Sequence, residues 1–222
     1  MLQSVEELKD EIVRATELLF KAGVMQHGGH GNLSARLPGD KMVLTSGGNI
    51  RGLTTADLAV VTFDGQVISG SIEPTNAEIV PMHAAIYRTR GDVGAIIHTH
   101  SPHVTAFALA HQPLPVAYEG LLRFGTQEPM PVAEWAPRGS DESVGNILRQ
   151  IEQHPTAPAV LLANHGLLAF GSDPLQTAQL IVSMEEAAEF TLGARDLGGE
   201  KPFPVGAAEK EQERMRQFQA SR

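Results

Sequence analysis

The sequence predicts an α/β or α+β fold around a mainly antiparallel sheet, formed by one domain spanning residues 1–222. Apolar residues make up 42% of the chain and charged residues 19%, which suffices for one hydrophobic core and a polar surface. Short apolar stretches of strand length follow one another closely, with turn residues between them, as in antiparallel hairpins. Segments with helical periodicity come between them at irregular intervals, whereas a parallel sheet needs a helical crossover between successive strands.

The N-terminal half begins with a helix and continues as strands. Ser4 and Glu7 form a capping-box pattern, apolar residues then recur every three or four positions, and Gly23 predicts the C-terminal end of the helix. A glycine-rich turn at residues 28–32 follows, and Asp64-Gly65 predicts a hairpin turn further on. The strands expected in this half cover residues 33–36, 41–45, 58–63 and 66–69.

The C-terminal half contains more helices. An apolar stretch at residues 93–99 has strand length, and the turn Asn164-His165-Gly166 separates two further strands at residues 160–163 and 167–170. The expected helices cover residues 77–90, 102–110, 141–153 and 174–196, and a charged helix or tail begins at about residue 207.

The composition excludes several classes of protein and site. The 17 basic and 26 acidic residues give a net charge of −9, the sign opposite to that expected of a nucleic-acid-binding protein. The sequence has no cysteine, which excludes disulfides, thiol nucleophiles and thiolate metal sites. The N-terminal residues are acidic and amphipathic, and the longest apolar stretch, at residues 158–170, is interrupted by polar residues. We therefore expect a cytoplasmic protein with no nucleic-acid or membrane partner.

Three histidines stand out by their positions at the ends of predicted strands. His98 and His100 end one apolar strand and, being two residues apart, share one face of it. His165 follows a second apolar strand. An isolated histidine is more often a hydrogen-bonded core residue, but a His-x-His pair at a strand end favours metal binding. Neutral imidazole is a common zinc ligand, and three of them leave one coordination position open for substrate or water.

Other folds that carry a His-x-His pair do not match the rest of the chain. A cupin barrel consists mostly of strands, whereas helices precede and follow this pair. A metal-dependent amidohydrolase barrel carries the pair on its first strand, and too few residues follow His100 for seven more strand–helix units. Metallo-β-lactamase-like hydrolases use His-x-His-x-Asp-His, and Pro102 stands at the aspartate position here.

Several short motifs in a fixed order connect the chain with one family. They are Gly31-Asn32-Leu33-Ser34, Leu44-Thr45-Ser46-Gly47-Gly48, Pro74-Thr75 leading to Glu78, Pro81-Met82-His83, His98-Thr99-His100 and Asn164-His165-Gly166-Leu167. Each motif alone is weak, but the ordered set is specific. On these motifs the chain resembles the class II aldolase/adducin-type family, whose members include fuculose-phosphate aldolases and ribulose-phosphate 4-epimerases, over residues 4–195.

The resemblance implies a fold, an assembly and a metal centre. The fold is a three-layer α/β/α sandwich with a central, mainly antiparallel sheet, and the assembly is a homotetramer with active sites between subunits. His98, His100 and His165 match the residues that hold a divalent metal, usually Zn²⁺, with Mn²⁺, Fe²⁺ or Co²⁺ as alternatives. Glu78 matches an acid that serves as a fourth ligand or as the catalytic base, and Tyr118 matches a proton donor that acts across a subunit interface.

The reaction implied is metal-dependent aldol cleavage or formation, in carbohydrate metabolism. A metal that chelates the hydroxyl and carbonyl oxygens of a small hydroxy-carbonyl or sugar-phosphate-like substrate acts as a Lewis acid and stabilises an enediolate. Glu78 would take or return the proton. Sugar-phosphate epimerisation, dehydration and decarboxylation of a keto- or hydroxy-acid are alternatives on the same scaffold. A non-catalytic binding head of the adducin type is a further alternative, against which the three histidines argue.

The resemblance also implies a binding site for the anionic end of the substrate. Relatives hold phosphate with backbone N–H groups and hydroxyls of three loops, which correspond to Gly31-Asn32, Ser46-Gly47-Gly48 and Thr75-Asn76. The chain departs from that pattern, because Gly47 replaces a hydroxyl residue, paired serines are absent beside Thr75, and one extra residue precedes His83. We expect weakened phosphate binding and a substrate with a carboxylate, or no anion, at that end. Further candidates for binding an anion are Arg123 and Arg138.

Overall fold

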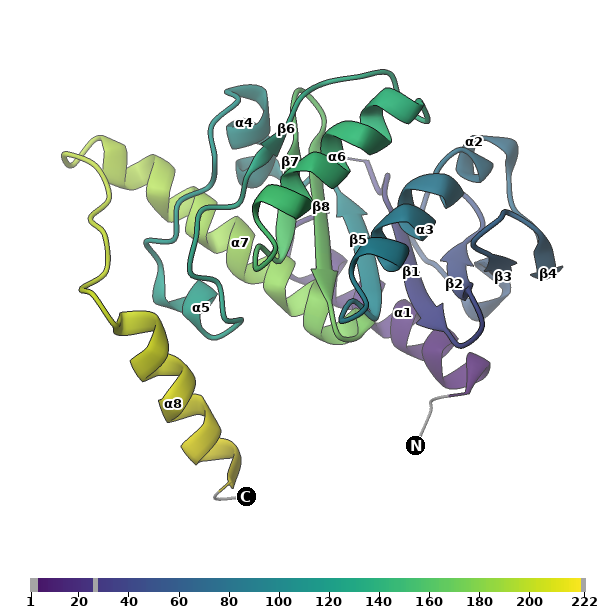
Figure 1. Cartoon of the computed structure of the whole chain (residues 1–222), viewed down its shortest axis with the longest axis horizontal. Helices are drawn as coiled ribbons and strands as arrows, with labels where there is room; N and C mark the ends of the chain where they lie inside the picture. Colours follow the sequence, from purple (N-terminus) through teal and green to yellow (C-terminus); the bar gives the residue numbers. More distant parts are fainter. Residues whose placement is uncertain (1–3, 26–27, 221–222) are drawn as a thin grey trace.

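The computed structural model describes residues 4–25 and 28–220, with side chains described to residue 218. Within these residues the strands form one eight-stranded sheet with the order β4-β3-β2-β1-β5-β8-β7-β6 (Figure 1). Every neighbouring pair is antiparallel except β6 and β7, which confirms a mainly antiparallel sheet. The strands are β1 (Asn32–Leu37), β2 (Lys41–Thr45), β3 (Leu58–Thr62), β4 (Val67–Ser69), β5 (Ala95–Thr99), β6 (Val132–Ala133), β7 (Ala159–Leu162) and β8 (Gly166–Gly171).

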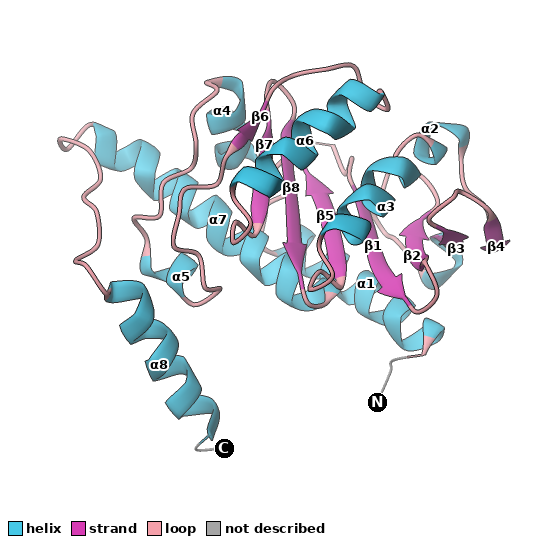
Figure 2. Ribbon diagram, viewed as in Figure 1, coloured by secondary structure: helices cyan, strands magenta, loops and turns pink. Residues whose placement is uncertain are grey.

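Helices cover both faces of the sheet and make a three-layer α/β/α sandwich, as expected (Figure 2). On one face α1 (Val5–Lys21) and α4 (Pro102–Leu109) pack against α7 (Pro174–Arg195), which also contacts β5 and β8. The other face is covered by α3 (Val80–Thr89) and α6 (Asp141–Gln153). No helix in the described ranges is long and apolar enough to cross a lipid bilayer. The remaining helices are α2 (Pro74–Ala77), α5 (Glu119–Leu122), α8 (Ala207–Ala220) and the 3-10 turn η1 (Thr55–Asp57).

Two hydrophobic cores lie on the two faces of the sheet, because neighbouring residues of a strand point in opposite directions. In β5, Ile97 packs in the core beside α1 and α7, whereas Ile96 packs in the core beside α3 and α6. Both side chains are fully buried. Burying a side chain of this size contributes about 1.5–3 kcal/mol to folding, so the strand that carries the histidine pair is held from both sides.

The capping box of α1 is present, and the helix expected over residues 77–90 is found with a later start. The Glu7 N–H donates to Ser4 Oγ at 3.2 Å, and the Ser4 N–H donates to the Glu7 carboxylate at 2.7 Å. This helix is α3, which begins at Val80, and of the expected range only Ala77 belongs to the preceding short helix α2. Pro81 lies in the first turn of α3, where its missing N–H costs no helical bond, and this favours a new helix start.

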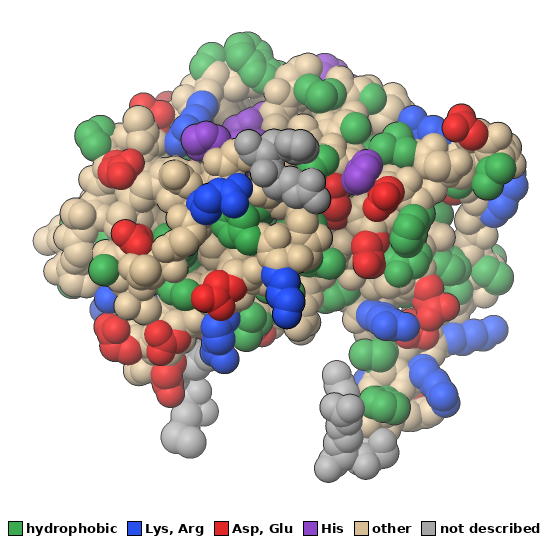
Figure 3. All heavy atoms as spheres, turned by 180° about the vertical axis from the view of Figure 1, so that it is seen from behind, with side chains coloured by type: hydrophobic (Ala, Val, Ile, Leu, Met, Phe, Trp, Pro, Cys, Tyr) green, Lys and Arg blue, Asp and Glu red, His purple; other side chains and the backbone are tan. Residues whose placement is uncertain are grey.

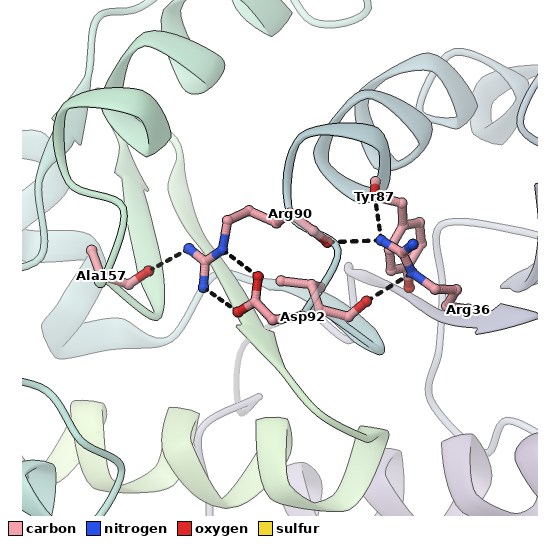
Figure 4. Close-up of polar contacts among 6 residues, drawn as sticks. Arg36, Tyr87, Arg90, Asp92 and Ala157 are labelled. Carbon is pink, nitrogen blue, oxygen red and sulfur yellow. Dashed lines mark hydrogen bonds and ion pairs between the residues drawn. The ribbon is translucent and has the colours of Figure 1, made fainter.

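Arg36 on β1 anchors the turn that leads into β5 (Figure 4). Its guanidinium donates to the carbonyl oxygens of Val93 and Arg90, each at 2.8 Å, and to that of Tyr87. Arg90 in turn donates to both carboxylate oxygens of Asp92, at 2.8 and 2.7 Å. These bonds fasten the C-terminal end of α3 to the sheet just before the strand that carries the histidine pair.

Beyond α7 the chain runs away from the sandwich and ends in α8, so the charged C-terminal segment is a helix (Figure 1). α8 packs against α5, where the Gln212 amide donates to the carbonyl oxygen of Leu122 at 2.6 Å. Neither α5 nor the two-residue strand β6 was expected from the sequence pattern.

Candidate metal centre

The three predicted histidines meet at one end of the sheet. His98 lies near the end of β5, His100 follows that strand, and His165 lies in the turn between β7 and β8. β5 pairs with β8 in a register that sets Thr99 opposite Leu167, which places the turn beside the end of β5. The ligand atoms of the three imidazoles lie within 4.8 Å of one another, and the ring centroids are 4.7–5.0 Å apart.

Hydrogen bonding and burial favour the neutral form of these rings. His98 Nδ1 lies 2.8 Å from the carbonyl oxygen of Leu167, which only accepts, so Nδ1 carries the hydrogen and the lone pair of Nε2 is free. Burial first, and then the neighbouring His165 and His100 rings, hold the pKa of His98 well below its usual value. Burial lowers the pKa of His100 to about 4 and also lowers that of His165. Neutral imidazole is the form that ligates metal.

Glycine at two positions lets the backbone approach the histidine pair. A Cβ at Gly166 would stand 2.5 Å from the Thr99 carbonyl oxygen and 2.8 Å from the His100 ring. A Cβ at Gly31 would stand 2.6 Å from the His98 carbonyl oxygen. Contacts this short are not tolerated by a side chain, so both glycines are required where the turn and the β1 entry pack on β5.

The histidines line a cavity of about 490 Å³ between the sheet end and the segment that precedes α6. In the view from behind, histidine side chains reach the surface near the upper edge of the molecule, beside a basic side chain (Figure 3). Of the predicted substrate-binding residues, those that line this cavity are Gly31, Asn32, Gly48 and Asn76. Those that do not line it are Ser46, Gly47 and Thr75.

Glu78 lines the same cavity but is not part of the histidine cluster. It follows α2 and precedes α3, so its side chain reaches the cavity from the break between the two helices and not from the face of a helix. Its Cβ and Oε2 lie 3.2 and 3.4 Å from where a Cβ of Gly139 would stand. Gly139 has a φ of 76°, a left-handed conformation that favours glycine. The loop at Gly139 therefore leaves room for the Glu78 carboxyl group.

Tyr118 lies in a different cavity from the histidines of its own chain. It precedes α5, and its cavity is lined by residues of α5, α7 and α8 that include Glu186 and Gln212. The Tyr118 hydroxyl donates to Glu186 at 3.4 Å, and its ring packs edge-on against Phe190. A single chain thus does not bring Tyr118 to the predicted metal ligands.

Two further residues line the cavity: Trp135, which was not a candidate from the sequence, and Arg138, which was a candidate for anion binding without an assigned place. Trp135 and Arg138 lie in the segment between β6 and α6. Trp135, the one tryptophan of the chain, is 62% exposed, and no pattern in the sequence indicates this exposure. Arg138 donates to the carbonyl oxygen of Thr75 at 2.7 Å, and it is the one Lys or Arg among the described residues that line the cavity.

Asn32 connects the cavity with a buried polar chain. Its Oδ1 lies 2.7 Å from His83 Nε2, His83 Nδ1 lies 2.7 Å from Ser34 Oγ, and Ser34 Oγ lies 2.8 Å from the Tyr87 hydroxyl. Burial lowers the pKa of His83 to about 3, so this ring is neutral at physiological pH. The sequence motif that contains His83 gave no indication of this contact.

Comparison with known proteins finds enzymes whose sequences are similar to this chain. The chain is 31% identical over 177 residues to a 3-oxo-tetronate 4-phosphate decarboxylase of Haemophilus influenzae, covering 74% of this chain and 79% of the relative. It is 28% identical over 202 residues to a 5-deoxy-D-ribulose 1-phosphate aldolase of Bacillus thuringiensis serovar kurstaki, covering 90% and 91%.

The fold and the family model give the same assignment. A solved L-fuculose 1-phosphate aldolase superimposes with a TM-score of 0.81 at 28% identity, over 97% of this chain and 98% of that one. The model of the class II aldolase and adducin N-terminal domain matches residues 10–192. The chain, with its sandwich fold and its three converging histidines, belongs to the class II aldolase and adducin family.

Proposed function

We propose that the chain is a metal-dependent lyase that breaks or forms a carbon–carbon bond in a small hydroxy-carbonyl compound. The observation that carries this proposal is the convergence of three imidazoles on a cavity that also contains a carboxyl group. A non-catalytic binding head would have no need of such a donor set. The enzymatic relatives support the same class of reaction.

The donor set fits a divalent metal. Three imidazole nitrogens match the protein ligands of catalytic zinc, and Mn²⁺, Fe²⁺ or Co²⁺ accept the same donors. In His98 the hydrogen bond from Nδ1 to a carbonyl oxygen leaves the lone pair of Nε2 free for the metal. When bound, such an ion supplies Lewis-acid stabilisation of negative charge that develops on the substrate carbonyl oxygen. His98, His100 and His165 would hold it.

The remaining chemistry is assigned to side chains of the cavity. Glu78 takes the proton from the substrate and returns it, because its carboxyl group lines the cavity beside the histidines. Asn32 and the backbone of Gly31 and Gly48, which also line the cavity, orient the substrate. Tyr118 donates a proton from a neighbouring copy of the chain, which requires a homo-oligomer, proposed here as a tetramer.

Decarboxylation of a keto- or hydroxy-acid is the second candidate. Loss of carbon dioxide and aldol cleavage both leave an electron pair next to a carbonyl group, so one site can serve either reaction. Arg138 specifically favours this candidate, since it adds a positive charge to the wall of the cavity. Epimerisation and dehydration start from the same proton removal by Glu78, but no further residue of the cavity favours them.

Metal analysis combined with a substrate panel tests the proposal. The protein is purified without added metal, reconstituted with Zn²⁺, and assayed with phosphorylated and unphosphorylated ketoses and keto-acids for release of aldehyde, pyruvate or carbon dioxide. We expect about one divalent ion per chain, as a three-histidine centre binds one ion, and aldehyde or pyruvate release. Carbon dioxide release without an aldehyde would assign the second candidate. Failure to bind any divalent metal would overturn both.

A further inference from the structure

We propose that the cavity selects a substrate whose anionic group is a carboxylate bound by Arg138, and that it disfavours the phosphate esters for which its relatives are named. This inference rests on the proposed function and adds the substrate class to it. Two independent features carry it: the carboxylate of Glu73, which lies against the second glycine-rich loop next to the cavity, and the guanidinium group of Arg138, which lines the cavity.

The first feature is Glu73, whose carboxylate lies against the loop Ser46-Gly47-Gly48. Its two oxygens lie 2.7 and 2.8 Å from where a Cβ of Gly47 would stand. The backbone fixes this approach, because the Glu73 N–H donates to the Ser46 carbonyl oxygen at 2.9 Å. A phosphate monoester carries a charge of about −1.5 to −2 at neutral pH. A carboxylate at this loop therefore repels the group that a glycine-rich loop would otherwise attract.

The side chains near this loop also offer few hydrogen-bond donors to an anion. The Asn76 amide nitrogen donates to the Thr45 carbonyl oxygen at 2.8 Å, so the free end of that amide is the acceptor Oδ1, which has no partner among the described residues. The oxygens of an ionised phosphate or carboxylate group accept hydrogen bonds, so neither anion gains from an acceptor at this position. Ser46 Oγ is also buried without a partner within the described part of the chain. One hydroxyl donor does not offset the charge of Glu73.

The second feature is Arg138, whose side chain lines the cavity. Its guanidinium donates one N–H to the Thr75 carbonyl oxygen, at 2.7 Å, and this bond holds the side chain at the cavity that contains the histidines. The supporting loop is itself fixed, because the Asn146 amide donates to the Glu134 carbonyl oxygen at 3.1 Å. The remaining N–H groups of a guanidinium match the two oxygens of a carboxylate in a planar, bidentate arrangement.

Three matched probes separate these effects, measured by calorimetric titration of the Zn²⁺-loaded full chain. Dihydroxyacetone, dihydroxyacetone phosphate and hydroxypyruvate share one hydroxyketone group and differ at the other end, which is a neutral hydroxymethyl, a phosphate ester and a carboxylate. We expect hydroxypyruvate to bind roughly tenfold to a hundredfold more tightly than dihydroxyacetone, the range of one charge-assisted hydrogen-bonded pair. We expect the phosphate ester to bind no more tightly than the neutral probe.

Charge-removing variants assign each effect to its residue. Arg138→Gln should abolish the preference for hydroxypyruvate, and Arg138→Lys should keep only part of it, because an ammonium group lacks the planar fork. Glu73→Gln should strengthen binding of dihydroxyacetone phosphate about tenfold or more. The matched controls are Arg88→Gln on α3 and Glu152→Gln on α6, which remove the same charges from exposed positions outside the cavity.

The outcomes distinguish the inference from the proposed function. If the probes bind but hydroxypyruvate is unaffected by Arg138→Gln, or dihydroxyacetone phosphate binds most tightly to the unmodified chain, the inference is wrong and the proposed function stands. If the Zn²⁺-loaded chain binds none of the three hydroxyketones, the proposed function fails and the inference fails with it.

Discussion

His83 Nε2 lies 2.7 Å from Asn32 Oδ1, and this contact fixes the direction of the amide group of Asn32. A carbonyl oxygen only accepts, so Nε2 carries the hydrogen of the neutral ring, and Nδ1 accepts from the Ser34 hydroxyl at 2.7 Å. The Tyr87 hydroxyl can then donate to Ser34 Oγ at 2.8 Å. Because Oδ1 is used in the core, the amide nitrogen is the end of Asn32 left for a ligand in the cavity.

Replacing His83 by leucine should therefore affect both stability and substrate binding. His83→Leu leaves buried acceptors and donors of Asn32 and Ser34 unpaired, which should lower the free energy of unfolding by about 1–3 kcal/mol. Because the Asn32 amide is then no longer held by His83, KM should rise by a larger factor than kcat falls. His83→Gln, which keeps one donor and one acceptor, should recover part of both effects. Denaturant unfolding and steady-state kinetics measure them, and a leucine variant with an unchanged KM would show that His83 does not position Asn32.

Stability should also depend on pH through His83. Its pKa is lowered to about 3 in the folded state by burial, whereas the unfolded chain has an ordinary value of about 6.5. Between these values the unfolded state binds one more proton, so stability rises with pH through this window and levels off above it. From pH 7 to pH 5, His83 should account for a loss of about 2 kcal/mol.

The variant His83→Gln isolates this contribution. In the metal-free protein His98, His100 and His165 also have lowered pKa values and destabilise the fold in acid in the same direction. They are present in both proteins, so the difference between the two stability profiles reports His83 alone. Urea unfolding at pH 5, 6, 7 and 8 gives the profiles. Equal slopes for the two proteins would contradict a neutral, buried His83.

The three predicted ligands should each be required for metal retention. Replacing His98, His100 or His165 by alanine should lower bound Zn²⁺ well below one ion per chain and abolish turnover, since a three-histidine centre that loses one ligand no longer holds the ion tightly. Circular dichroism checks that the fold remains. His154→Ala is the matched control, because His154 pairs with Glu128 away from the cavity. Full metal content in His165→Ala would remove that residue from the centre.

Glu78 should matter for turnover and not for metal content. Glu78→Gln keeps the shape of the side chain and removes the proton acceptor, so kcat should fall about a hundredfold or more while bound Zn²⁺ is unchanged. A loss of metal would instead make Glu78 a ligand. Near-normal turnover would move the role of base to another group, and Glu73 is the nearest alternative acid in the sequence.

The parts of this molecule that could be predicted depend on local patterns. The capping box of α1, the hairpin at Asp64-Gly65 and the strand that ends in the histidine pair are each specified by residues a few positions apart. The convergence of His165 on that pair was also predictable, but only through the order of the family motifs.

The remaining features depend on contacts between distant segments. His83 meets Asn32 across 51 positions and Arg138 meets Thr75 across 63, and no periodicity in a single sequence indicates such pairs. The short helix α2 ends just before Glu78, and α3 begins at Val80, three residues later than expected. α5 and β6 have four and two residues, which is too short for a periodic signal.

Tyr118 lies outside the histidine cavity of its own chain and is expected to complete the cavity of a neighbour. Each active site would then combine the histidines of one chain with Tyr118 of another. Tyr118→Phe and His98→Ala should both be inactive alone, but a mixture refolded or exchanged into common oligomers should regain about a quarter of normal activity, the statistical share of sites with both parts intact in a closed symmetric assembly.

The matched control is a mixture of His98→Ala with His165→Ala, whose defects fall in the same half of the site and cannot complement each other in any arrangement. Differently tagged chains show that mixed oligomers have formed. Recovery in the first mixture and none in the control would place Tyr118 across a subunit interface. Full activity of Tyr118→Phe alone would limit the residue to packing against Phe190, and mixed oligomers without recovery would show that its hydroxyl group acts within its own chain.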